Sequence, residues 1–160
     1  ETVKKRQGPW ILIRTFSKAY AMAGMRIGYA LCSDRDLAQA LRKTTCVFNV
    51  PILAMAAAEA ALSDTDHLQI MMEIVASARR QLTTGLEELG LSPFPSATNF
   101  VSVKLPVLAS SVAKEMLEKG VQIHAWPDPG FENFIRITVG RPEDNDACLK
   151  ALSEVLRGKP

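Results

Sequence analysis

The sequence predicts an α/β fold, because two kinds of hydrophobic pattern recur along its 160 residues. Short apolar runs rich in β-forming residues, some of them alternating with polar residues, are typical of strands. Longer segments with apolar residues three and four positions apart are typical of amphipathic helices. Glycine and proline punctuate the segments, so the elements can be placed in chain order.

In the first part of the chain, the patterns predict two strands followed by two helices. One strand follows Gly8-Pro9, and the second begins after a loop that contains Gly24. Ser33 or Asp34 caps the first helix, and Pro51 opens an alanine-rich second helix. The predicted strands span residues 10–14 and 27–32, and the predicted helices span about 34–47 and 52–62.

In the second part, a long amphipathic helix over about 67–89 ends at Gly90 and precedes a strand–helix–strand–strand–helix series. The predicted elements of that series span residues 99–105, 110–119, 121–126, 134–139 and 142–156. Two strands cannot close a sheet, whereas the later series is enough for a small α/β domain. We therefore expect residues 1–66 to be the end of a larger domain and residues 67–160 to be a small carboxy-terminal domain that includes the bridging helix.

The chain opens with Glu1-Thr2-Val3, without an initiator methionine, and enters an apolar strand within ten residues. We therefore expect an amino-terminal portion to be missing, so that any site in the chain is part of a larger one.

Composition argues against several classes of protein. The formal net charge is +2 and the basic residues are spread out, whereas nucleic-acid binding needs a clustered positive face. The cysteines Cys32, Cys46 and Cys148 suit neither a disulfide framework nor a zinc site, and with only His67 and His124 as histidines we expect no metal. Free cysteines fit a cytoplasmic location, and we expect no signal peptide and no membrane span.

The loop after the first strand carries the strongest chemical signal. Thr15 and Ser17 supply hydroxyl groups, Arg26 supplies a permanent cation, and Gly24 allows close backbone approach, so the loop suits a phosphate dianion. Lys18 lies among these groups, where nearby positive charge and limited water favour the neutral amine that Schiff-base chemistry needs. Short motifs also arise by chance, so the residue types alone leave a surface role for Lys18 and Arg26 open.

Residues 14–29, Arg-Thr-Phe-Ser-Lys-Ala-Tyr-Ala-Met-Ala-Gly-Met-Arg-Ile-Gly-Tyr, resemble the cofactor-lysine signature of class I/II aminotransferases, particularly the histidinol-phosphate aminotransferase branch. The resemblance implies that Lys18 carries pyridoxal 5'-phosphate covalently. It also implies that Thr15, Ser17 and Arg26 bind the phosphate of this cofactor. The implied fold is the end of the large fold-type I transferase domain followed by the small carboxy-terminal domain.

A second match, Phe-Ile-Arg-Ile-Thr-Val-Gly at residues 134–140, resembles the family strand whose arginine binds the substrate carboxylate. That role falls on Arg136, although alternation alone also allows an outward-facing residue on an edge strand. The family arginine that holds the phosphate of histidinol phosphate is matched by His124, a weaker and pH-dependent phosphate partner. This departure leaves room for a non-phosphorylated substrate, or for a strand histidine with no ligand role.

The resemblance implies transamination between an amino donor and a 2-oxo acid in a homodimer. It also implies that further cofactor contacts lie upstream, so this chain alone is expected to be an inefficient catalyst. Two alternatives remain open: a decarboxylase of the threonine-phosphate type, which has a similar lysine motif, and a non-catalytic fragment or assembly domain.

Overall fold

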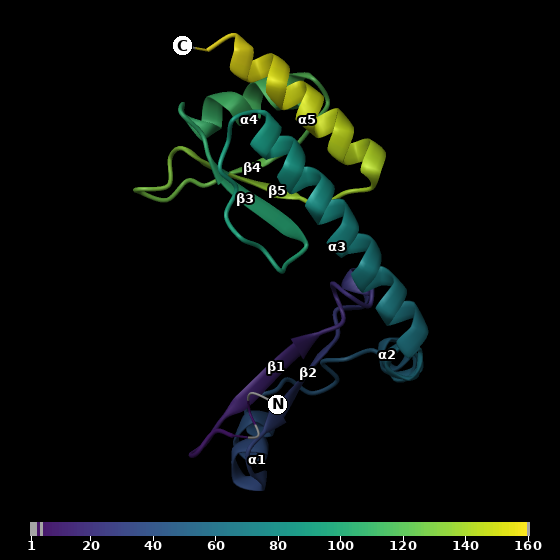
Figure 1. Ribbon diagram of the computed structural model, residues 1–160. Coiled ribbons are helices and arrows are strands. Elements are labelled where there is room, and N and C mark those ends of the chain that lie inside the picture. Colours follow the sequence, from purple (N-terminus) through teal and green to yellow (C-terminus); the bar gives the residue numbers. More distant parts are fainter. Residues whose placement is uncertain (1–2, 4, 160) are drawn as a thin grey trace. The chain divides into compact units, whose positions relative to one another are not determined.

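The protein consists of two compact units, Glu1–Met71 and Met72–Pro160. The structure is a computed structural model and describes residue 3 and residues 5–159, so Glu1 and Thr2 lie outside the described part. The division falls within the longest helix, α3 (Thr65–Glu88) (Figure 1). Among the described residues, no helix is both long and apolar enough to cross a membrane.

The first unit contains two strands and two helices, as the sequence predicts, and the two strands form an antiparallel pair. In the pair, Ile11 lies opposite Cys32 and Thr15 lies opposite Gly28. The elements are β1 (Ile11–Thr15), the 3-10 turn η1 (Ala23–Met25), β2 (Gly28–Cys32), α1 (Arg35–Lys43) and α2 (Ile52–Ser63). Asp34 caps α1 by accepting a hydrogen bond from the Leu37 amide at 2.9 Å. That bond, together with one from Ser33, holds the pKa of the Asp34 carboxyl below its ordinary value.

Helix α1 is shorter than predicted, because it ends at Lys43 rather than near residue 47. The hydroxyls of Thr44 and Thr45 both donate to the Leu41 carbonyl, at 2.8 and 2.9 Å. Threonine side chains compete in this way with the backbone bonds that would continue a helix. The apolar pattern of this segment did not reveal that competition.

Gly24, in the turn before β2, and Gly28, the first residue of β2, differ in the space available for a side chain. A Cβ atom at Gly28 would lie 2.6 Å from the Arg14 carbonyl oxygen, whereas a Cβ at Gly24 would meet nothing within 4 Å. We expect Gly28→Ala to lower the free energy of unfolding by about 1–3 kcal/mol, because backbone must shift to admit the methyl group. Gly24→Ala is the matched control and should leave stability unchanged or slightly raised. Chemical denaturation measures both, and equal effects would contradict this account of Gly28.

The second unit is a three-stranded antiparallel sheet packed against helices. The strand order is β3-β5-β4, so β5 is central. The elements beyond α3 are β3 (Phe100–Lys104), α4 (Ala109–Glu118), β4 (His124–Ala125), β5 (Phe134–Thr138) and α5 (Pro142–Arg157). Helix α5 runs beside the carboxyl-terminal part of α3, where Gly85 faces Leu149 and the Asn145 side chain donates to the Ala78 carbonyl at 3.1 Å (Figure 1).

One face of this sheet forms the core. Val101, Val103 and Ile135 are fully buried, and Ile137 is nearly so. They pack against buried side chains that include Leu82, Leu86, Val112, Met116 and Leu152. Alternation therefore places Phe100, Ser102, Phe134 and Arg136 on the opposite face of the sheet.

Strand β4 is shorter than predicted, since only His124 and Ala125 pair with β5. The residues before them close the end of α4. The Val121 amide donates to the Met116 carbonyl at 2.9 Å, and Gly120 has a φ of +81°. This is the hydrogen bond and left-handed glycine of a helix carboxyl cap, so the start of the predicted strand serves the preceding helix.

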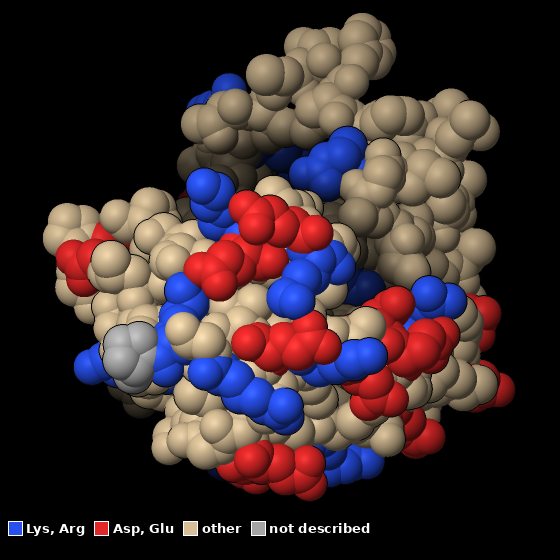
Figure 2. Space-filling view, turned by 90° about the horizontal axis from the view of Figure 1, so that it is seen from above, with Lys and Arg blue, Asp and Glu red and all other residues tan. Residues whose placement is uncertain are grey.

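Two ion pairs link the region of helix α4 to that of helix α5. Lys119 pairs with Glu154 at 2.7 Å, and Lys159 pairs with Glu115 at 2.6 Å. The hydrogen bond from Arg141 holds the pKa of the Asp144 carboxyl below its ordinary value. Figure 2 shows a face on which acidic and basic side chains are interspersed. Solvent-exposed pairs such as Lys119–Glu154 contribute little to stability, whereas the Lys159 side chain of the other pair is only 18% exposed.

Candidate active site

The end of β1 and the loop that joins it to β2 hold all four residues of the predicted cofactor site, with Thr15 as the last residue of the strand. Buried Phe16 anchors the start of this loop, with its ring centroid 4.9 Å from Tyr20 and 5.7 Å from Tyr29. The Phe16 amide also donates to the Ile27 carbonyl at 3.2 Å, which extends the strand pairing by one bond. Because Phe16 turns inward, its neighbours Thr15 and Ser17 lie on the more accessible side of the chain.

The two predicted phosphate-binding hydroxyls lie next to each other. The Thr15 hydroxyl donates to the Ser17 hydroxyl at 2.9 Å, and the Ser17 amide donates to the Thr15 oxygen at 3.1 Å. Lys18 follows with an exposed side chain, and its carbonyl accepts a hydrogen bond from the Ala21 amide at 2.9 Å. Lys18 therefore begins a hydrogen-bonded turn and directly follows Ser17, the second residue of the hydroxyl pair.

Arg26 closes the same loop in a strained conformation. Its φ is +52°, which is uncommon for a residue with a side chain and costs about 1–2 kcal/mol. Its guanidinium donates to the Ala23 carbonyl at 2.7 Å, so the side chain is folded back over η1. Backbone strain of this kind often accompanies a functional site. Gly24, which the sequence predicts as the point of close backbone approach to a phosphate, has open space around it, whereas Gly28 lies close to the Arg14 carbonyl of the neighbouring strand.

The predicted carboxylate-binding residue, Arg136, lies in the second unit on the central strand β5. The alternative that placed it on an edge strand is wrong. The Arg136 side chain is half-buried, and its guanidinium carbon lies 5.2 Å from the ring centre of Phe100 and 5.9 Å from that of Trp126. A guanidinium held over ring faces keeps its in-plane N–H groups available for a carboxylate.

His124 lies directly opposite Arg136 in the strand pairing. Its side chain is exposed, and its ring meets Trp126 edge-on with the centroids 5.4 Å apart. The structure therefore brings His124 and Arg136 together on one sheet, with Trp126 touching both.

Sequence reasoning missed the aromatic residues around Arg136. A hollow of about 370 Å³ adjoins them, lined by Phe94, Ser102, Trp126, Asp128, Phe131 and Phe134. The alternation that places Phe134 and Arg136 on one face was visible in the sequence. The pairing register that brings Ser102 and Trp126 beside them was not.

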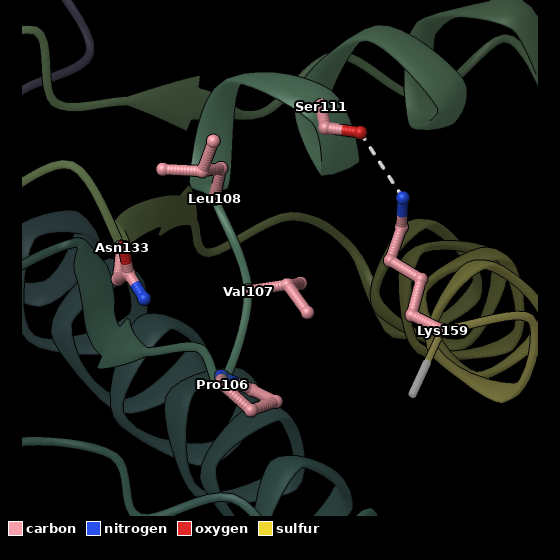
Figure 3. Close-up of a pocket in the computed structure, with 6 residues that line it drawn as sticks. All are labelled: Pro106, Val107, Leu108, Ser111, Asn133 and Lys159. Atoms are coloured by element: carbon pink, nitrogen blue, oxygen red, sulfur yellow. Dashed lines mark hydrogen bonds between the residues drawn. The ribbon is translucent and has the colours of Figure 1, made fainter.

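A second hollow in the same unit, of about 470 Å³, contains none of the predicted site residues (Figure 3). Its lysine, Lys159, points toward Ser111 and donates to that hydroxyl at 3.0 Å and to Glu115 at 2.6 Å, so its charge is already paired. Burial raises the pKa of the Cys148 thiol to about 11, which makes it a poor nucleophile. In the described part of the chain, no group of three or more histidine, cysteine or acidic residues could hold a metal ion.

The chain belongs to the family of class I and II aminotransferases, whose family model matches residues 2–152. It is 37% identical over 152 residues to histidinol-phosphate aminotransferase 1 of Mesorhizobium japonicum, covering 95% of this chain and 41% of that protein. The α/β fold matches part of a solved histidinol-phosphate aminotransferase from Sinorhizobium meliloti in complex with pyridoxal 5'-phosphate. That comparison gives 37% identity and a TM-score of 0.84, and covers 92% of this chain and 41% of that one.

Another similar solved structure is that of an enzyme named for decarboxylation and not for amino transfer. L-threonine-O-3-phosphate decarboxylase from Porphyromonas gingivalis is 27% identical with a TM-score of 0.77, covering 92% of this chain and 46% of that chain. The chain thus spans less than half of the length of these relatives.

Proposed function

We propose that the protein is a pyridoxal-phosphate-dependent aminotransferase that moves an amino group between an amino acid, or a similar amine, and a 2-oxo acid. The segment from Thr15 to Arg26 carries the proposal, because it combines a lysine, two hydroxyls that are hydrogen-bonded to each other and an arginine. This donor set fits a phosphate dianion beside a reactive amine. Bound pyridoxal phosphate would supply an electron sink for the substrate α-carbon.

Each residue then has a defined task. Thr15, Ser17 and Arg26 would hold the phosphate of bound pyridoxal phosphate, the first two through their hydroxyl groups and Arg26 through a charge-assisted bond. Lys18 would hold the cofactor, and its amine would move the proton at the substrate α-carbon as general base and then general acid. Arg136 holds the substrate carboxylate with its planar fork of donors, and His124 contacts the remainder of the substrate.

The organisation of the intact enzyme is part of the proposal. Residues 1–66 would end a large cofactor-binding domain of fold type I, and residues 67–160 would form the small carboxy-terminal domain. We also propose a cytoplasmic homodimer. The exposed apolar side chains of Val47, Phe48, Ile52 and Leu53, which are 75–97% accessible, support a subunit interface in the first unit.

A decarboxylase of the threonine-phosphate type is the second candidate, favoured by the similarity to the solved Porphyromonas gingivalis enzyme. Both reactions use the same lysine and differ in which bond to the α-carbon breaks. Parallel assays of carbon dioxide release and of amino transfer to a 2-oxo acid separate them. A non-catalytic fragment or assembly domain would show neither product.

Borohydride reduction in the presence of pyridoxal phosphate tests the central assignment. We expect one dominant pyridoxyl adduct, on Lys18, in peptide maps of the longest natural form of the enzyme, because its neighbours bind the phosphate. A weaker adduct in the 160-residue chain alone would show that residues beyond it complete the site. Labelling scattered over surface lysines in both forms would refute the cofactor site.

A further inference from the structure

The face of the β3-β5-β4 sheet that carries Arg136 also carries an aromatic hollow. We propose that this hollow binds the uncharged ring of an aromatic carboxylate while Arg136 holds the carboxylate group. The proposal deepens the function proposed above and rests on it for the identity of the ligand as a substrate. Ring binding itself requires only residues of the second unit.

Ring contacts build the walls of the hollow. Phe94 and Phe134 are stacked, with centroids 5.8 Å apart and planes 22° apart. Phe131 contacts both Phe134 and Trp126, with its ring centroid 5.2 Å from that of Phe134 and 6.2 Å from that of Trp126. Ser102 and Asp128 are the two polar residues of the lining. A volume of about 370 Å³ with mostly aromatic walls suits a flat apolar group.

The hollow and Arg136 share a wall. Trp126 lines the hollow and also lies 5.9 Å from the Arg136 guanidinium. Ser102, another lining residue, is the direct strand partner of Arg136. A carboxylate bound to Arg136 therefore has the aromatic hollow as its immediate neighbour on the same face of the sheet, so one small molecule can occupy both.

The charges near the hollow favour an uncharged ring over a second anionic group. Asp128 in the lining would repel a phosphate, and the faces of aromatic rings are electrostatically negative. Lys104 is a cation near the hollow. Its ammonium nitrogen lies 5.9 Å from the centre of the Phe134 ring, and the residue is exposed to solvent. A ligand with a phosphate could use Lys104, or His124, whose ring meets Trp126 edge-on, so the test must include such a ligand.

A nuclear magnetic resonance titration can follow the indole N–H of Trp126, assigned with a Trp10→Phe variant. The probes are 3-phenylpropionate, propionate and 3-phosphonopropionate, none of which carries an amine that can react with the cofactor. We expect 3-phenylpropionate to bind at least about 10-fold more tightly than propionate, because the ring leaves water. Phe131→Ala should raise the Kd of 3-phenylpropionate about 3- to 10-fold and leave that of propionate unchanged.

Leu117→Ala is the matched control, since Leu117 is an apolar residue of α4 in the same unit, is 59% exposed and does not line the hollow. It should leave every Kd unchanged. The proposal is overturned if 3-phenylpropionate binds no more tightly than propionate, if 3-phosphonopropionate binds more tightly than either, or if Phe131→Ala weakens both simple carboxylates equally. None of these titrations involves Lys18 or the cofactor, so a failure here is distinct from a failure of the borohydride test.

Discussion

Replacing Lys18 by alanine is expected to lower the kcat of amino transfer by about 10³- to 10⁴-fold. The variant loses the amine that moves the proton at the substrate α-carbon, and it also loses the covalent attachment of the cofactor. Steady-state assays with the best amino donor and a 2-oxo acid measure the change. A small amine such as methylamine, added to the variant, should restore part of the rate, because it can carry the same proton.

Lys43→Ala provides the control, since Lys43 is an exposed lysine at the end of α1 in the same unit. Its kcat should equal that of the unmodified enzyme. Loss of activity through misfolding would not respond to methylamine, so the rescue separates a chemical role of Lys18 from a structural one. A Lys18→Ala enzyme that retains kcat within about tenfold would rule out the general base assigned here.

Local patterns were sufficient for most of the elements. The strands predicted at residues 10–14 and 27–32 occur as β1 and β2, each shifted by no more than one residue at either end. Each combines β-forming residues with flanking glycine or proline, so local preference and tertiary structure agree there. The long helix predicted over 67–89 occurs as α3, which begins two residues earlier because Thr65 and Asp66 form its first turn.

Features that depend on distant contacts were not predictable in the same way. Alternation showed that the Arg136 side chain lies on the other face of the strand from Ile135 and Ile137. Only the strand order shows that β5 is central. The rings of Phe100 and Trp126 flank Arg136 because of the pairing register, which spans segments far apart in the sequence. Register is set by turns and by packing of the whole sheet, and neither can be read from one strand.

The candidate cofactor site likewise has some features that the sequence predicts and others that only the folded chain shows. The four residues of the cofactor site lie in one short segment between the end of β1 and the start of β2, so their spacing in the sequence already limited how far apart they could be. They are Thr15, Ser17, Lys18 and Arg26. The strain at Arg26 and the steric need for Gly28 were not visible in that spacing. They arise because the loop must return to pair Gly28 with Thr15.

Replacing Arg136 by glutamine is expected to raise the KM for the amino-acid substrate about 100-fold with a smaller change in kcat. The glutamine keeps one amide donor but loses the charge and the paired N–H groups, and charge-assisted bonds to a carboxylate contribute about 1.5–3 kcal/mol. Arg136→Lys should recover little, because an ammonium group cannot form the planar fork that Phe100 and Trp126 hold in place. Initial rates over a range of donor concentrations measure both variants.

A comparison of substrates makes the role of Arg136 specific. An amine substrate that lacks the carboxylate has nothing for the guanidinium to bind, so Arg136→Gln should leave its kcat/KM nearly unchanged. Arg141→Gln is the matched control, since Arg141 is exposed and pairs with Asp144 at 3.0 Å at the start of α5. Its KM for the amino acid should stay the same. If Arg136→Gln weakened both substrates to the same extent, the residue would be supporting the sheet and not holding the carboxylate.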